Sequence, residues 1–324
     1  MIFDAHSDLW SDVTARREAG ERDVLAQRHL LAMAEGGVEG SVFVLWADPI
    51  GGTDYVTATA RLLAGAKAEL AGCGQVRLVR TWAEIEEARR QGKFYIVLGV
   101  EGMAAIGDRP SGVDWYYARG VRWGMLTWNE ENALATGAGG PAGSGLTAAG
   151  RQAVRRMEEL GMVVDVSHLN DGGFRDVAAL AQGIVVASHS NCRRLCDVPR
   201  NLTDDQLRAI RDSGGVIGVN AYHGFVHKER QYQNVEMLAR HAAHIIDVCG
   251  VEHLGCGFDF CQYLGPGNDP IPDMTGPAQA PRLLDALRRM GLREDEVALV
   301  ARDNWLRVLR TVLGGNNAVV QNRI

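Results

Sequence analysis

The sequence predicts an α/β fold, and more narrowly a (β/α)8 barrel, on three observations. Eight short apolar runs recur along the chain, and several are nearly continuous in β-branched residues, as is typical of parallel strands buried on both faces. Segments with helical start and stop signals lie between these runs. The length of 324 residues suits one barrel of this kind. A doubly wound open sheet is the alternative for the same alternation.

The eight expected strands are short apolar runs that follow one another along the chain. The first, "MIFDA", starts at residue 1, and the third, "FYIVLGV", is an almost unbroken apolar run. Runs of this length and composition favour buried strands over helices. The eight expected strands cover residues 1–5, 40–46, 94–100, 120–126, 161–167, 183–188, 214–220 and 253–259.

Three of the intervening helices have clear boundaries in the sequence. Thr81 and Glu84 stand at the spacing of a capping box, and so do Thr203 and Gln206. A third helix is expected over 147–161, where apolar residues recur on one face and a glycine ends the segment. The helices therefore alternate with the strands, as the barrel requires.

The domain organisation follows from the absence of any linker, low-complexity block or fixed-period repeat. We expect one barrel domain of the metal-dependent hydrolase type over residues 1–324. The glycine-rich piece 136–147 is expected to be a loop, and 281–313 is expected to form two closing helices that split near "MGLRED".

Composition and charge exclude several classes of partner. The formal net charge is −6 with no basic cluster, which argues against nucleic acid and anionic membranes. No run reaches the roughly 18 apolar residues of a membrane-spanning helix, and no export signal is visible. The six cysteines form no CxxC pair, so we expect reduced thiols in a cytoplasmic protein.

Polar residues follow the expected strands at the points where chemistry is found in α/β barrels, the carboxyl ends. His6 and Asp8 come after the first strand and point to the same side of an extended chain. Singly, a histidine at a strand end is more often structural than a ligand, but three histidines and three carboxylates at one end of a sheet indicate a metal site. The remaining members of this set are Glu101, His168, His189 and Asp259.

The residue types in this set indicate which metal ions it would bind. Imidazole and carboxylate together suit zinc, with manganese, cobalt and iron as alternatives. Five or six ligands exceed the needs of one tetrahedral ion and fit two ions that share a bridging carboxylate. Related hydrolases often bridge with a carboxylated lysine, but the three lysines, Lys67, Lys93 and Lys228, do not follow expected strands. Glu101 is therefore the expected bridge.

With these residues, the sequence resembles the membrane (renal) dipeptidase family of zinc metallopeptidases, in its soluble bacterial-type branch. The resemblance extends over nearly the whole chain and rests on several ordered motifs. They are "DAHSDLW" at 4–10, "GVEG" at 99–102, the segment 145–168 that ends in "VDVSH", the segment 187–205 that begins "ASHSN", "GFDF" at 257–260 and "DNWLRVL" at 303–309.

The resemblance implies a barrel that binds two Zn2+ ions per chain and hydrolyses dipeptides. His6 and Asp8 would hold one ion, His168 and His189 the other, and Glu101 would bridge them. Two cations lower the pKa of a shared water, so that a bridging hydroxide can attack the peptide carbonyl near neutral pH. Members of the family are commonly dimers, which implies a homodimer here.

The resemblance also assigns roles around the metals. Asp259 would pass a proton to the departing amine, and Glu101 and Asp259 are thus the residues closest to the reaction. Arg200 matches the arginine that binds the free carboxylate of the substrate, for which a planar guanidinium is suited. Tyr222 matches a tyrosine near the same carboxylate.

Two positions depart from the family pattern. Trp128 stands where family members carry a histidine that polarises the scissile carbonyl, so either Trp128 or its neighbour Asn129 takes over that contact, or the metals do, or the substrate differs. Trp128 as a plain pocket wall is the competing interpretation. Cys261 stands where the family often has a second acid.

Three functions are therefore open to this sequence. The first is a dipeptidase, including action on dipeptides with a D-residue at the C-terminal position. The second is a two-metal hydrolase of the same fold that acts on another small amide, an N-acyl amino acid or a lactam. The third, a non-catalytic relative, predicts missing ligands, and none is missing.

Overall fold

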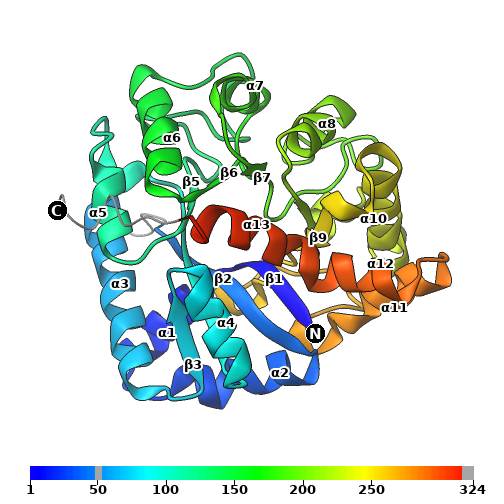
Figure 1. Ribbon diagram of the computed structural model, residues 1–324, viewed down its shortest axis with the longest axis horizontal. Helices are drawn as coiled ribbons and strands as arrows, with labels where there is room; N and C mark the ends of the chain where they lie inside the picture. The colour runs from blue at the N-terminus through cyan, green and yellow to red at the C-terminus, as the bar shows by residue number, and fades with distance from the viewer. Residues whose placement is uncertain (48–52, 316–324) are drawn as a thin grey trace.

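The computed structural model describes residues 1–47 and 53–315, in which parallel strands curl into a barrel (Figure 1). The strands are hydrogen-bonded in the order β7-β6-β5-β4-β2-β1-β9-β8. A parallel bridge between Ala187 and Ile217 joins the two ends of this row, next to β7 and in β8. The predicted (β/α)8 barrel is confirmed, and the open-sheet alternative is wrong because the end strands meet.

All eight expected strands are present, although those in the second half of the chain are only two or three residues long. They are β1 (Ile2–Ser7), β2 (Val38–Trp46), β4 (Phe94–Glu101), β5 (Trp123–Met125), β6 (Val163–Asp165), β7 (Val185–Val186), β8 (Ile217–Val219) and β9 (Leu254–Cys256).

One further strand, β3 (Val76–Val79), has no counterpart in the sequence analysis. It pairs with the first half of β4, from Phe94 to Val97, whereas β5 pairs with the second half. The missed strand is four residues long and one of them, Arg77, is exposed, so its apolar signal is too short to separate from a loop.

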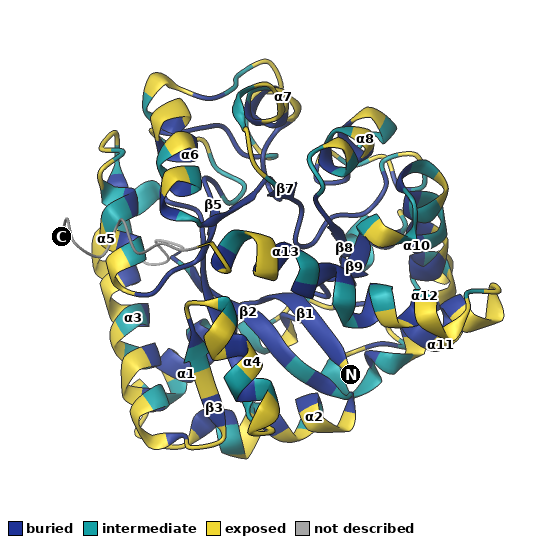
Figure 2. Cartoon of the chain, in the orientation of Figure 1, coloured by how far each residue is buried: buried dark blue, intermediate teal, exposed yellow. Residues whose placement is uncertain are grey.

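Helices surround the barrel and turn their buried faces toward it (Figures 1 and 2). None of the helices in residues 1–47 and 53–315 is long and apolar enough to cross a membrane. The α-helices are α1 (Leu9–Glu18), α2 (Leu30–Glu35), α3 (Tyr55–Gly72), α4 (Trp82–Arg90), α5 (Gly112–Ala118), α6 (Ala148–Leu160), α7 (Asp171–Leu180), α8 (Asp204–Asp212), α9 (His223–Val226), α10 (Val235–Cys249), α11 (Pro281–Arg289), α12 (Glu294–Ala298) and α13 (Asn304–Leu313).

The predicted helix boundaries are confirmed. Thr81 and Glu84 form a complete capping box at the start of α4, and Thr203 and Gln206 form another at α8. Helix α6 ends at Gly161, whose φ of 69° is the left-handed conformation that glycine adopts without strain.

The C-terminal helix α13 covers the amino ends of the strands. Arg307 donates hydrogen bonds to the carbonyl oxygens of Gly214 and Glu252, which precede β8 and β9. Trp305 reaches into the barrel, where its ring lies 5.5 Å from that of Trp123 and its Nε1 donates to the carbonyl of Cys256 at 2.9 Å. With the amino ends closed by packed side chains, the carboxyl ends remain for a site.

The six cysteines are buried free thiols. Burial raises the pKa of Cys192 well above its usual range and that of Cys249 to about 11, so those thiols stay protonated near neutral pH. This agrees with the expectation of reduced cysteines.

Candidate metal centre and active site

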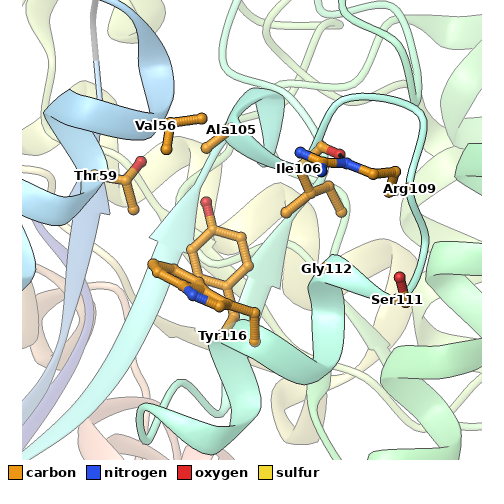
Figure 3. A pocket seen from close by; sticks show the side chains of 9 residues that line it. Val56, Thr59, Ala105, Ile106, Arg109, Ser111, Gly112 and Tyr116 are labelled. Carbon is orange, nitrogen blue, oxygen red and sulfur yellow. Dashed lines mark hydrogen bonds between the residues drawn. The ribbon is translucent and has the colours of Figure 1, made fainter.

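A cavity of about 720 Å³ opens at the carboxyl ends of the strands. Asp8, Glu101, His168 and Asp259, four members of the predicted ligand set, line it. A different cavity of about 320 Å³ lies between α3 and α5 and is lined by apolar side chains such as Ile106 (Figure 3). None of the predicted site residues lines that smaller cavity.

The predicted set comes together in space. His6 is in β1, Asp8 follows it directly, and Glu101 is the last residue of β4. His168, His189 and Asp259 follow β6, β7 and β9 respectively. Except for Asp259, each of these residues has at most 6% of its surface exposed. Each of them therefore lies at the carboxyl end of a strand.

The first group of donors surrounds the Nε2 atom of His6. This nitrogen is 3.5 Å from Asp8 Oδ2, 3.5 Å from Glu101 Oε1 and 3.8 Å from Asp259 Oδ1. Three carboxylates and one imidazole thus face a common point, and His6, Asp8 and Asp259 together have the spacing of a cation site.

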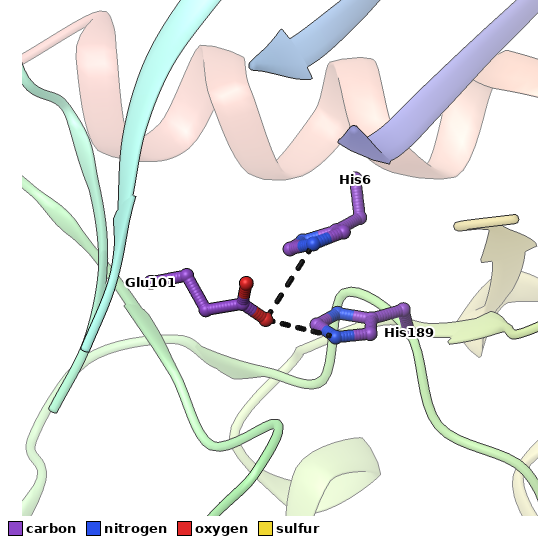
Figure 4. Close-up of side chains that lie close together, drawn as sticks. All are labelled: His6, Glu101 and His189. Atoms are coloured by element: carbon purple, nitrogen blue, oxygen red, sulfur yellow. Dashed lines mark ion pairs between the residues drawn. The ribbon is translucent and has the colours of Figure 1, made fainter. Parts of the chain in front are cut away.

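The second group shares one atom with the first. Glu101 Oε1 is 2.8 Å from His168 Nε2 and 3.4 Å from His189 Nε2, and it also faces His6 (Figure 4). The Nε2 atoms of His168 and His189 are 2.9 Å apart. One glutamate oxygen is therefore close to a histidine of β1 and to the histidines that follow β6 and β7.

These residues fit divalent cations. Both ring nitrogens of His6 are buried and have no hydrogen-bond partner among the described residues, which is costly for a polar group unless another species binds it. His168 and His189 direct two ring nitrogens at each other, an arrangement that a cation between them would stabilise. The mixture of imidazole and carboxylate donors is that of zinc and similar ions.

The ring nitrogens that face away from the cluster are held by neighbouring side chains. His189 Nδ1 shares a 2.7 Å hydrogen bond with Ser188 Oγ, and His168 Nδ1 donates to Asn129 Oδ1 at 2.9 Å. Such bonds fix the orientation of each ring and direct Nε2 into the cluster. Asn129, which was expected in substrate binding, thus lines the cavity and also orients a candidate ligand.

We expect Asn129→Ala to weaken binding of the second metal equivalent by about 10–100-fold, because His168 loses the acceptor that fixes its ring. The first equivalent should bind as in the wild type. Competition with a chromophoric chelator measures both. Asn129→Asp keeps an acceptor oxygen and should retain the affinity; equal losses in the two variants would contradict this role.

A buried carboxylate, Asp165, ties the two histidine-bearing segments together. Its Oδ1 accepts hydrogen bonds from the backbone of Ser167 at 2.9 Å and of Ser188 at 3.1 Å, one residue before His168 and His189. Its Oδ2 accepts from Trp123 Nε1 at 2.7 Å. Sequence reasoning missed Asp165, because its position within an apolar run resembles an ordinary strand residue.

The carboxylates control the protonation of His6. Burial lowers the pKa of His6, but Glu101, Asp8 and Asp259 outweigh it and raise this pKa to about 10. Burial raises the pKa of Glu101 well above its usual range, and the negative charge of Asp8 adds to this. The first group therefore holds a proton tightly, and a divalent cation would replace it.

The second group is electrostatically different. Burial, followed by the positive charges of Arg200 and His6, holds the pKa values of His168 and His189 well below the usual range. Both rings are therefore neutral near pH 7, the form in which histidine binds metal.

Two of these residues have left-handed backbone conformations although they are not glycines. The φ angle is 73° at His168 and 59° at Asp259. This region is unfavourable for residues with a Cβ atom and is concentrated at functional sites, where surrounding structure holds it in place. Both turns redirect the chain at a strand end so that the side chain enters the cluster.

The upper wall of the cavity is aromatic. Trp128 and Trp46 meet edge to face with ring centroids 5.3 Å apart, and Tyr222 and Phe225 meet in the same way at 4.7 Å. All four line the cavity. Trp128 and Tyr222 are therefore part of the cavity wall.

Arg200 is buried beside the second group. Its Nη1 donates to Ser190 Oγ at 2.7 Å and its Nη2 donates to the carbonyl of His189 at 2.9 Å. Its Nε is buried without a partner among the described residues. Burial lowers the pKa of Arg200 to about 10, so the guanidinium remains charged near neutral pH.

Comparisons with known proteins agree with one another. The model of the family described as membrane dipeptidase (peptidase family M19) matches residues 1–321. An uncharacterized protein in the pqqA 5′ region of Klebsiella pneumoniae is 37% identical over 248 residues, which is 74% of this chain and 90% of that one. Dipeptidase verJ of Clonostachys rogersoniana is 32% identical over 72% of this chain, and the match spans 60% of its length.

Solved structures extend the likeness. The metallopeptidase dipeptidase AC is 28% identical with a TM-score of 0.86, over 97% of this chain and 99% of that one. A metallopeptidase from Rhodobacter sphaeroides, solved with a phosphinate mimic of the dipeptide L-Ala-D-Ala, is 27% identical with a TM-score of 0.84, over 96% and 99% of the two chains.

Proposed function

The chain belongs to the membrane dipeptidase family of metallopeptidases and is a metallo-dipeptidase, and from this premise we propose that it cleaves dipeptides with two zinc ions. The observation that carries the proposal is Glu101 Oε1, which lies 3.5 Å from His6 Nε2, 2.8 Å from His168 Nε2 and 3.4 Å from His189 Nε2. A carboxylate that lies near donors for two ions can bind both of them and so bridge the pair.

In this proposal His6 and Asp8 would hold one ion, His168 and His189 would hold the other, and Glu101 would contact both. A pair of ions bound there supplies an activated water at neutral pH and polarises the carbonyl of the substrate. The neutral rings of the second group and the carboxylates of the first provide the donors that each ion needs.

Asp259 transfers the protons in this proposal. It lines the cavity beside the first group, and burial raises the pKa of its carboxyl above the usual range. A carboxyl with a raised pKa can accept a proton from the attacking water and return it to the amine that leaves.

Arg200 and Tyr222 bind the C-terminal carboxylate in this account. The unpartnered Nε of Arg200 and its retained charge support this assignment. The requirement for a free carboxylate limits substrates to those with one residue after the scissile bond.

We expect Arg200→Lys to raise KM for a dipeptide by about 10–100-fold, because lysine cannot match the planar, charge-assisted contact of a guanidinium. Steady-state kinetics on a dipeptide and on its C-terminal amide measure this. For the wild type, amidation of the C-terminal carboxylate should raise KM by a factor similar to that of the substitution. For the variant, amidation should raise KM little further. Arg194→Lys, at an exposed position on the same loop, is the control; a KM shift equal for acid and amide would contradict the assignment.

Trp128 is the main departure from the family pattern. Because of it we retain a second candidate function, hydrolysis of an N-acyl amino acid, another small amide or a lactam. An indole can donate one hydrogen bond but cannot carry a proton charge, so carbonyl polarisation rests chiefly on the metals. Action on a D-residue at the C-terminal position is part of the primary proposal and is supported by the L-Ala-D-Ala mimic bound to the Rhodobacter sphaeroides relative.

A panel of L-L and L-D dipeptides, N-acyl amino acids and simple lactams, assayed with zinc-loaded protein, separates the candidates. The proposal expects hydrolysis of dipeptides and little activity on the rest. Hydrolysis confined to N-acyl amino acids would select the second candidate.

We also propose a cytoplasmic homodimer. Buried, reduced thiols suit a reducing compartment, and dimers are common in the family. Light scattering of the purified chain tests the dimer.

A further inference from the structure

Asp259 is held at both carboxylate oxygens, and we propose that Asn220 and Cys261 are positioning residues that keep it as a proton carrier and away from the first metal ion. The proposal rests on the proposed function, since it concerns the acid/base residue of that reaction. Neither Asn220 nor Cys261 belongs to the ligand set.

Asn220 holds one oxygen in a fixed direction. Its Nδ2 donates to Asp259 Oδ2 at 2.9 Å, and its Oδ1 accepts from the backbone of Tyr222 at 2.6 Å. Because only the oxygen of the amide can accept from that N–H, its nitrogen must face Asp259. Asn191 in turn exchanges two hydrogen bonds of 2.9 Å with the backbone of Asn220, so the donor cannot rotate away.

Cys261 holds the other oxygen. Its Sγ is 2.8 Å from Asp259 Oδ1 and 3.1 Å from Asp8 Oδ2. A thiol has one proton, so it donates to one carboxylate at a time and links the proton carrier to a candidate metal ligand. The side chain lines the cavity at its buried end.

The position of Asp259 explains why two donors are needed. Its Oδ1 is 3.8 Å from His6 Nε2, and with His6 and Asp8 it has the spacing of a cation site. A small rotation would make it a third carboxylate ligand of the first ion and remove it from proton transfer. Its left-handed φ of 59° is unfavourable for a residue with a Cβ atom and persists where surrounding contacts hold it.

The decisive variants are Cys261→Ala and Cys261→Ser, with Asn220→Ala as a second route to the same effect. We expect Cys261→Ala and Asn220→Ala each to lower kcat by about 10-fold, the usual effect of losing one hydrogen bond to a charged group, while KM and zinc content stay within about twofold. Cys261→Ser keeps a donor and should recover most of kcat. Cys249→Ala, a buried thiol on α10 outside the cavity, should match the wild type.

Wild-type kcat in Cys261→Ala, or a Cys261→Ser variant as slow as Cys261→Ala with metal content unchanged, would overturn the proposal. A purely structural role would instead lower zinc content or thermal stability in the alanine variants without separating kcat from KM.

Cobalt-substituted protein provides a readout that needs no substrate. A positioning thiol predicts no sulfur-to-cobalt charge-transfer absorption in the wild type, and altered cobalt d–d bands in Cys261→Ala but not in Cys249→Ala, because Sγ contacts Asp8. A charge-transfer band that disappears in Cys261→Ser would show a metal ligand and overturn the proposal. A wild type that hydrolyses no dipeptide would refute the proposed function, and the cobalt spectra would still decide the role of Cys261.

Discussion

Asp259→Asn is expected to lower kcat on dipeptides by about 10²–10⁴-fold while two metal ions remain bound, because the amide cannot carry the proton that the carboxylate transfers. The substitution conserves size and keeps an oxygen that can accept from Cys261. Burial already raises the pKa of this carboxyl, so loss of its charge should not unfold the site. Steady-state kinetics together with elemental analysis of the purified variant measure the effect.

The same experiment separates two roles for Asp259. With His6 and Asp8 it could also form part of a cation site. If it is a ligand, Asp259→Asn loses one metal equivalent along with activity; if it is the proton carrier, metal content is unchanged. Asp269→Asn, at an exposed position ten residues further on, is the matched control and should behave as the wild type. Unchanged turnover in Asp259→Asn would refute the assignment.

Glu101→Gln is expected to reduce bound zinc from two equivalents to one or none and to lower activity by about 10³-fold or more. The neutral amide removes the charge that faces both donor groups, and a glutamine oxygen is a weak bridge between two cations. Elemental analysis, with kinetics at saturating zinc, measures the loss.

Stability provides a control for Glu101→Gln. In metal-free protein the buried carboxylate is disfavoured by burial and by Asp8, which is why its pKa is raised well above the usual range. Thermal unfolding in chelator should therefore show the variant to be at least as stable as the wild type. Glu86→Gln, at an exposed position on α4, should bind two equivalents. Two equivalents and near-normal activity in Glu101→Gln would contradict its bridging role.

Much of the barrel could be predicted because its signals are local. Apolar runs such as "FYIVLGV" and capping pairs such as Thr81 and Glu84 depend on residues close in sequence. The strand β3 could not be predicted, since four residues that pair with half of β4 carry too little pattern. Its existence depends on a partner that the local sequence does not reveal.

The cluster could be predicted for a related reason. In a parallel barrel all carboxyl ends meet, so a polar residue after each strand is enough to bring His6, Glu101 and His189 together. Their supporting contacts could not be predicted. They join residues 23–42 positions apart: Asp165 with Ser188 and Trp123, Asn129 with His168, and Asn220 with Asp259. In the sequence each could equally be an ordinary polar residue.

The most direct test of the account is a zinc titration of metal-free protein in which hydrolysis of an L-L and an L-D dipeptide is followed as metal is added. The account predicts that activity on at least one of them rises until two equivalents per chain are bound and then stays constant. Full activity at one equivalent, or no hydrolysis of either dipeptide with two equivalents bound, would contradict it.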